Sequence, residues 1–216
     1  MNPFLGTVFV SLWMATVLLT AVAVRKQWPT ERELSRKIIH IGTGFIIPIA
    51  WFCNLSASLV ISLSAGITLL TAINRHWRII PAVEDIDRNS YGTVAYGVSI
   101  TLLLILFWPD RADAVTAGVL VMALGDGFAG LIGRRLDSAR WTLMDQTKSL
   151  IGTSVMAGIS CLVLTMLSFY SGTGVEPLRL VSMTIIAVIL EQFSFFGIDN
   201  LTVPIVISIL WSQLIA

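Results

Sequence analysis

Charged residues are scarce in this chain. Asp, Glu, Lys and Arg together make up 12% of its 216 residues, whereas 56% are hydrophobic. A soluble domain usually carries about 25% charged residues, so the composition argues against a soluble globular protein. The formal net charge of +1 also gives no reason to expect a nucleic-acid partner.

Cysteine is scarce too, and several nucleotide-binding signatures are missing. Cys53 and Cys161 lie at or within apolar stretches and provide neither a disulfide framework nor metal-ligand spacing, so we expect small buried hydrophobes. The chain has no P-loop lysine motif and no protein-kinase signature. It has no internal repeat or linker either, so we predict a single domain over residues 1–216.

What the chain has instead is a series of apolar stretches close to the length of a hydrocarbon core. The second, seventh and eighth stretches are short, as is common where helices stop at a functional cavity. The sequence therefore predicts an all-α, polytopic integral membrane protein with about eight (seven to eight) transmembrane helices. The stretches cover residues 4–24, 38–53, 56–73, 91–108, 114–133, 149–169, 178–190 and 201–215.

The connecting loops alternate in basic charge. Twelve of the fourteen Lys and Arg residues fall in the loops after the first, third and fifth stretches, and only Arg111 and Arg179 fall on the other side. The positive-inside rule then predicts cytoplasmic basic loops and both termini on the non-cytoplasmic side. The sequence does not identify the membrane, which would be a plasma, inner or thylakoid-type membrane in a bacterial cell.

Residues 29–37 have the pattern of a helix start. Thr30 and Glu33 have the spacing of a capping box, and Pro29 precedes them. We therefore expect a short interfacial helix that leads into the second apolar stretch.

The fifth stretch carries Asp126 in its centre, although a charge there costs about 2.5–3.5 kcal/mol on insertion scales. On a helix, Gly130 and Arg134 follow at the i+4 and i+8 positions. A carboxylate suits Mg²⁺, a bare backbone admits a bulky ligand, and a guanidinium suits phosphate, so this stripe is a candidate seat for a metal-bound nucleotide. A small-residue packing face with a satisfied aspartate explains the stretch equally well.

The glycines of this stretch also match a dinucleotide-binding fingerprint. Gly125, Gly127 and Gly130 have the G-x-G-x-x-G spacing, but that fingerprint requires a preceding strand and a βαβ unit. Here the glycines lie inside a predicted membrane helix, so we discard this interpretation.

Four further polar clusters interrupt the apolar pattern, and each has an ordinary explanation. A helical histidine is usually just hydrogen-bonded, a lysine at a helix end snorkels, loop carboxylates are solvated, and tyrosine is common at interfaces. All five clusters nevertheless fall at predicted cytoplasmic ends, which scattered structural groups have no reason to prefer. The four clusters are Arg36, Lys37, His40 and Gly44; Lys148, Ser149 and Gly152; Glu191, Asp199 and Asn200; and Arg88, Gly92 and Tyr96.

Several of these blocks resemble a known family of lipid kinases. "RKIIH", "GDGFAGLIGRR" followed by "KSLIG", and "EQFSFFGIDNLTVP" are similar to blocks shared by dolichol kinases, CTP-dependent diacylglycerol kinases and phytol or farnesol kinases. The "GD…A…GRR…K" portion is also similar to the signature of CDP-diacylglycerol synthases. The blocks span residues 36–204, and the short chain with "GIDNLTVP" looks most like the phytol (prenyl alcohol) kinase branch.

The resemblance implies phosphoryl transfer from a nucleoside triphosphate, typically CTP, to the hydroxyl of a lipid alcohol, with Mg²⁺ as cofactor. The nucleotide would come from the cytoplasm and the alcohol from the bilayer. The implied metal ligands are Asp126, Glu191, Asp199 and Asn200. The implied nucleotide-binding residues are Gly125, Gly127, Ala129, Gly130, Gly133, Arg134, Arg135, Lys148, Ser149, Gly152, Arg36 and Lys37.

The base that receives the alcohol proton stays open between Asp199 and His40, and Lys148 is a further catalytic candidate. A dolichol, polyprenol or diacylglycerol kinase and a cytidylyltransferase that makes a CDP-lipid are the nearest alternatives. A transporter would require midplane charges and repeated halves, and a non-catalytic assembly factor would bind no nucleotide.

The predicted topology is testable by cysteine labelling. In a chain whose two native cysteines are replaced by alanine, a cysteine at Arg140 should react with a thiol reagent supplied from the cytoplasm. A cysteine at Asn54 should react only from the opposite side, because the loop asymmetry places these positions on different faces. Labelling of position 54 from the cytoplasm would contradict the predicted orientation.

Overall fold

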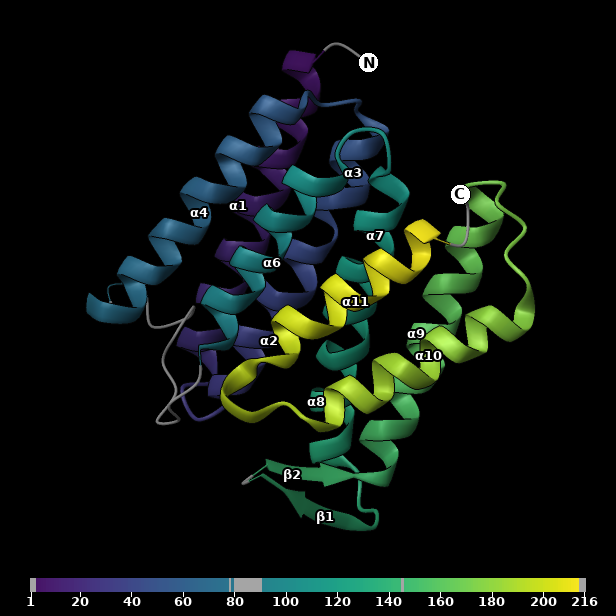
Figure 1. The fold of residues 1–216 in the computed structure, drawn as a ribbon. Coiled ribbons are helices and arrows are strands. Elements are labelled where there is room, and N and C mark those ends of the chain that lie inside the picture. Colours follow the sequence, from purple (N-terminus) through teal and green to yellow (C-terminus); the bar gives the residue numbers. More distant parts are fainter. Residues whose placement is uncertain (1–2, 78, 80–90, 145, 214–216) are drawn as a thin grey trace.

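The computed structural model describes residues 3–77, 79, 91–144 and 146–213, and the described part is almost entirely helical (Figure 1). One short antiparallel hairpin accompanies the helices. The helices are α1 (Pro3–Gln27), α2 (Arg32–Gly44), α3 (Ile46–Phe52), α4 (Ala57–Trp77), α6 (Gly92–Phe107), α7 (Ala112–Leu120), η1 (Val121–Asp126), α8 (Gly127–Arg135), α9 (Leu150–Tyr170), α10 (Pro177–Gln192), η2 (Phe195–Gly197) and α11 (Asp199–Gln213), and the strands are β1 (Arg140–Leu143) and β2 (Gln146–Ser149).

Each of the eight predicted apolar stretches coincides with helix, so the prediction of a nearly all-α chain is confirmed. Four described segments are long and apolar enough to cross a membrane, namely residues 4–27, 57–77, 112–135 and 150–170. These segments support a membrane protein, while the number of crossings and the side of the termini stay predictions. Arg78 and Arg88, which belong to the predicted basic loops, lie outside the described residues.

The second apolar stretch is divided into two helices at Phe45. Pro48 lies in the first turn of α3 and has no N–H to donate to the Gly44 carbonyl, so a continuous helix would lose a hydrogen bond there. The break separates a polar half, α2, which carries Arg36, Lys37 and His40, from an apolar half that packs in the core.

The core surrounds one central helix formed by α7, η1 and α8 without interruption over residues 112–135. Val115, Val119 and Met122 on this helix are completely buried, and α2, α9 and α11 all pack against it. The segment η1 is a π-helical turn, which widens the helix just before Asp126. Such turns occur frequently at functional sites.

The predicted capping box is wrong. The helix begins at Arg32 with Glu31 at the N-cap position, and no side chain caps it. Glu33 instead pairs with Arg36 and with Arg134, which lies far away in the chain. The hairpin over residues 140–149 was also not predicted, and it places Lys148 and Ser149 immediately before α9.

The two ends of the helix bundle differ in which helix termini they contain (Figure 1). α1 begins and α11 ends away from the hairpin, whereas the C-terminal ends of α1 and α8 and the N-terminal ends of α2 and α9 lie toward it. The described basic residues of the predicted cytoplasmic loops therefore gather at one end. Both cysteines are free thiols, with Cys53 buried and Cys161 half-buried.

The closest approach between α7 and α11 occurs at Gly118. A Cβ atom at this position would lie 2.2 Å from the Pro204 carbonyl oxygen and 2.2 Å from Ser208 Oγ. Gly118→Ala should therefore force the helices apart and lower the free energy of unfolding by about 1–3 kcal/mol. Gly158→Ala on α9 is the control, because a Cβ there meets no described atom within 4 Å. Equal thermal stability of the two variants in detergent would contradict the packing role of Gly118.

Candidate functional site

A polar cavity of about 430 Å³ lies where the basic end of the bundle meets the hairpin. Five separate parts of the chain contribute to its wall: α2, the central helix, the hairpin, the start of α9, and the segment from the end of α10 to the start of α11. Its lining residues are Arg36, Lys37, Asp126, Ala129, Gly130, Gly133, Arg134, Arg140, Gln146, Thr147, Lys148, Ser149, Gly152, Thr153, Glu191, Ser194, Gly197, Asp199 and Asn200.

An ion pair between Lys37 and Asp126 forms one wall of the cavity. Lys37 Nζ lies 2.6 Å from Asp126 Oδ2 and donates a second hydrogen bond to the Asp126 carbonyl oxygen at 3.1 Å. The Lys37 residue is only 3% exposed. Two opposite charges at this depth are tolerated because each is the other's partner, whereas either one alone would be costly.

His40 lies beside this pair, on the next turn of α2. Its Nε2 atom is 3.4 Å from both Asp126 Oδ2 and the carbonyl oxygen of Met122. The Met122 and Asp126 carbonyls both belong to the π-helical turn. The widened turn thus presents backbone oxygen as well as the carboxylate toward α2.

A second ionic group covers the outer side of α2. Glu33 accepts hydrogen bonds from Arg36 Nη2 at 2.8 Å and Nε at 3.1 Å, and its other oxygen lies 3.3 Å from Arg134 Nη2. Burial alone would raise the pKa of the Glu33 carboxyl, but the Arg36 and Arg134 guanidiniums reverse the effect and lower it to about 2. Glu33 therefore stays ionised and ties α2 to the end of α8.

The opposite wall holds Lys148 in place. Its Nζ atom pairs with Glu191 Oε1 and donates to the Glu191 carbonyl oxygen at 2.6 Å and to Ser194 Oγ at 2.7 Å. Glu191 Oε2 also accepts a hydrogen bond from Gln192 Nε2 at 3.0 Å. This network fixes a lysine from the hairpin against the end of α10, so Glu191 acts here as a partner of Lys148.

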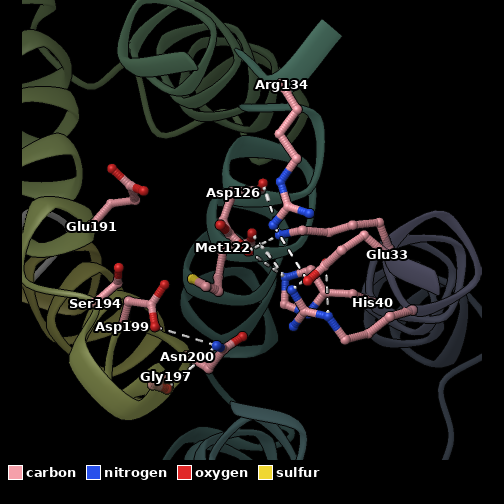
Figure 2. A network of polar contacts seen from close by, with 12 residues as sticks. Glu33, His40, Met122, Asp126, Arg134, Glu191, Ser194, Gly197, Asp199 and Asn200 are labelled. Atoms are coloured by element: carbon pink, nitrogen blue, oxygen red, sulfur yellow. Dashed lines mark hydrogen bonds and ion pairs between the residues drawn. The ribbon is translucent and has the colours of Figure 1, made fainter. Parts of the chain in front are cut away.

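Asp199 is a different kind of carboxylate. It is buried, and within the described ranges no cation forms an ion pair with it. Asn200 Nδ2 approaches Asp199 Oδ1 at 3.4 Å and the Gly197 carbonyl at 3.3 Å. Figure 2 shows Asp126 between the α2 side chains on one side and Glu191, Ser194 and Asp199 on the other.

The carboxylates of the cavity limit how Mg²⁺ could be held. Among the described residues, no group of three or more His, Cys, Asp or Glu side chains is arranged to hold a metal ion by itself. Mg²⁺ is usually bound through one or two carboxylates together with substrate phosphates. A single unpaired carboxylate, Asp199, beside the partly occupied Asp126 fits that mode and does not fit a closed protein cage.

The small residues of the central helix divide into two groups. Ala129, Gly130 and Gly133 line the cavity. Gly125 and Gly127 face other helices, since a Cβ at these positions would lie 2.5 Å from Met156 Sδ and 2.4 Å from Ile41 Cγ1. The small residues thus combine both interpretations drawn from the sequence. Gly125 and Gly127 serve helix packing, whereas Gly130 and Gly133 line the cavity and also lie close to Lys37 and to Gly152.

Most of the predicted site residues are brought together in this cavity. Arg135 is exposed at the end of α8, and His40 lies in the wall of a second cavity next to the first. Gly92 and Tyr96, from the fifth predicted cluster, also line that second cavity, while Arg88 lies outside the described residues.

The sequence did not indicate several lining residues. Arg140, Gln146, Thr147 and Thr153 reach the cavity through the hairpin and the first turn of α9. Arg140 was counted only as a basic loop residue, and nothing in its local pattern distinguishes it from the others. The hairpin register, in which Trp141 pairs with Lys148, is what directs this segment to the site.

The chain as a whole is similar to known proteins in sequence. No family model matches it, and no solved structure matches it with significance. A phytol kinase of Synechocystis sp. is 37% identical over 199 residues, which cover 89% of this chain and 84% of that protein.

Plant proteins are also similar. A probable chloroplastic phytol kinase of Triticum aestivum is 25% identical over 81% of this chain and 65% of its own length. Probable phytol kinase 2 of Oryza sativa subsp. japonica, also chloroplastic, is 27% identical over 93% of this chain and 73% of its own length. The family resemblance of the sequence blocks is confirmed by these matches, and the chain belongs to the phytol kinase family.

Proposed function

We propose that this protein transfers a phosphoryl group from a nucleoside triphosphate, with CTP as the expected donor, to the hydroxyl of a prenyl alcohol such as phytol. The observation that carries the proposal is the convergence of three carboxylates and five cations in one cavity at the basic end of the bundle. The relatives named as phytol kinases supply the substrate class. The reaction would take place at the cytoplasmic membrane interface.

The cations of the cavity suit a triphosphate. Arg36, Lys37 and Lys148 are held by carboxylate partners, so their positions are set before a ligand arrives. Arg134 and Arg140 lie nearer the exposed rim. Fixed positive groups around phosphate oxygens stabilise the charge that spreads over a transferred phosphoryl group, and this is the main source of catalysis in such reactions.

Asp126 and Asp199 are the residues proposed to hold Mg²⁺ together with the nucleotide phosphates. When bound, the ion would neutralise phosphate charge and orient the β- and γ-phosphates. Asn200 lies next to Asp199 and can add a carbonyl oxygen. Glu191 is assigned a supporting position, because its carboxylate already holds Lys148.

The transfer breaks the bond between the γ-phosphorus and the oxygen that bridges to the β-phosphate. A new bond forms from the γ-phosphorus to the alcohol oxygen, the nucleoside diphosphate leaves, and the alcohol proton passes to a protein base. Asp199, which lines the cavity without a cation partner, and His40, which lies beside Asp126, are the two bases in reach of this region.

The decisive experiment uses the purified protein with radiolabelled CTP, ATP, GTP or UTP and a panel of phytol, farnesol, polyprenol and diacylglycerol. A prenyl monophosphate together with a nucleoside diphosphate is the expected product pair. Release of pyrophosphate with a nucleotide-linked lipid would instead identify a cytidylyltransferase. Absence of any nucleotide-dependent product across the panel would overturn the proposal.

The role of Asp126 can be separated from its structural role as the partner of Lys37. Asp126→Asn should lower turnover by at least about 100-fold, and it should also lower stability, because a buried lysine then lacks its partner. The double variant Lys37→Met with Asp126→Asn removes both charges, so we expect thermal stability to recover while activity stays lost. Near-normal turnover in the double variant would leave Asp126 with a packing role only.

Substitution of Gly130 tests whether the central helix forms part of the nucleotide-binding site. A side chain there enters the cavity, where a Cβ would lie 2.9 Å from Lys37 Cε and 3.2 Å from its Nζ. Gly130→Leu should weaken nucleotide binding by tenfold or more, about 1.4 kcal/mol, in a titration. Gly158→Leu is the control, since position 158 is exposed on α9 and open. Equal nucleotide affinity in both variants would place the nucleotide elsewhere.

A further inference from the structure

A second cavity, of about 280 Å³, lies beside the first among α1, α2, α3, α4 and α6. Aliphatic side chains form most of its wall, including Leu18, Ile39, Ile67 and Ile100. Among the described residues that line it, Arg36 at one end is the only Asp, Glu, Lys or Arg. Such a cavity suits an apolar ligand with a single polar end.

The two cavities adjoin. Arg36 and Asn200 line both of them, so the two cavities share this part of their walls. His40 stands at this boundary. Its Nε2 atom approaches Asp126, whereas its ring lies against Tyr96 with the centroids 4.5 Å apart inside the wall of the apolar cavity.

The apolar cavity is elongated along α4. Its lining on α4 reaches from Ser64 to Asn74, and the C-terminal end of α4, where Asn74 lies, points toward the basic end of the bundle (Figure 1). These residues are ten positions apart, which corresponds to about 15 Å along a helix. The long direction of the cavity therefore runs from the polar cavity toward the middle of the bundle. A lipid chain whose polar head group lies in the polar cavity would extend in the same direction.

The cavity also lies next to the lipid-facing side of the bundle. α1 packs on α2 and α3, whereas α4 packs on α6, and both α1 and α4 lie at the outer edge (Figure 1). Leu69 and Leu70 on α4 are largely exposed, as expected for a surface in contact with acyl chains. An apolar molecule can thus approach this cavity from the bilayer without crossing water.

Building on the proposed kinase function, we propose that this apolar cavity binds the isoprenoid chain of the alcohol substrate. The hydroxyl end lies at the shared wall formed by Arg36 and Asn200, next to His40, and the chain extends along α4 toward Ser64. The length of this cavity then contributes to the selection of the alcohol. A single narrow chain fits this shape, whereas a diacylglycerol with two acyl chains does not.

The test fills the end of the cavity at Ser64. Ser64→Phe places an aromatic ring there, so kcat/KM for a twenty-carbon prenyl alcohol should fall about tenfold or more relative to that for a ten-carbon one. Ser62→Phe is the matched control, with the same substitution on an exposed position of the same helix. The nucleotide affinity of both variants should equal that of the parent, which shows that the polar site is intact.

A binding measurement separates this proposal from the kinase function. A prenyl alcohol with a diazirine at its far end should cross-link to peptides of α4 and α6 in the parent and in Ser62→Phe, and only weakly in Ser64→Phe. If the parent phosphorylates prenyl alcohols but the two variants show the same chain-length profile and the same cross-links, the cavity assignment is overturned and the kinase function stands. Specific cross-linking without any phosphoryl transfer would retain the cavity assignment and overturn the kinase function.

Discussion

The buried ion pair between Lys37 and Asp126 is the constraint on which the rest of the structure depends. A charge inside a membrane helix is stable only with a partner, and removing one member of a buried pair typically costs about 3–5 kcal/mol. The pair therefore requires α2 to lie directly against the π-helical turn. Gly127 makes this approach possible, because a Cβ there would lie 2.4 Å from Ile41 Cγ1. The glycine at position 127 thus follows from the need to bring these two charges together.

The placement of α2 also explains why two cavities of opposite character share a wall. Lys37 faces the polar cavity, Ile39 and Thr43 face the apolar one, and Arg36 lines both. Residues three and four apart lie on one helix face, so a single amphipathic helix can line both. The break at Phe45 ends this polar segment, and α3 continues as core.

The helices and most site residues were predictable from the sequence. The apolar stretches and the polar residues within them are both visible in short segments of the chain. Apolar stretches define helices within a few residues, and the site residues stood out as polar groups where lipid disfavours them. The failures arose from contacts between distant parts of the chain. Thr30 and Glu33 matched a local capping pattern, but Glu33 pairs with Arg134, a hundred or so residues away. The hairpin likewise depends on packing near α10, where Trp141 Nε1 donates to Gln192 Oε1 at 3.2 Å.

The depth of Asp126 has a consequence for the charge balance of the site. Five cations and three carboxylates line the polar cavity, which leaves a formal excess of two positive charges. Such an excess suits the proposed triphosphate. Arg36, Lys37 and Lys148 are already paired with carboxylates, so their positions are set before any ligand binds, and fixed cations of this kind stabilise phosphate charge without reorganisation. The Asp126 carboxylate, placed within an apolar helix, is thus the counterion that keeps Lys37 in position.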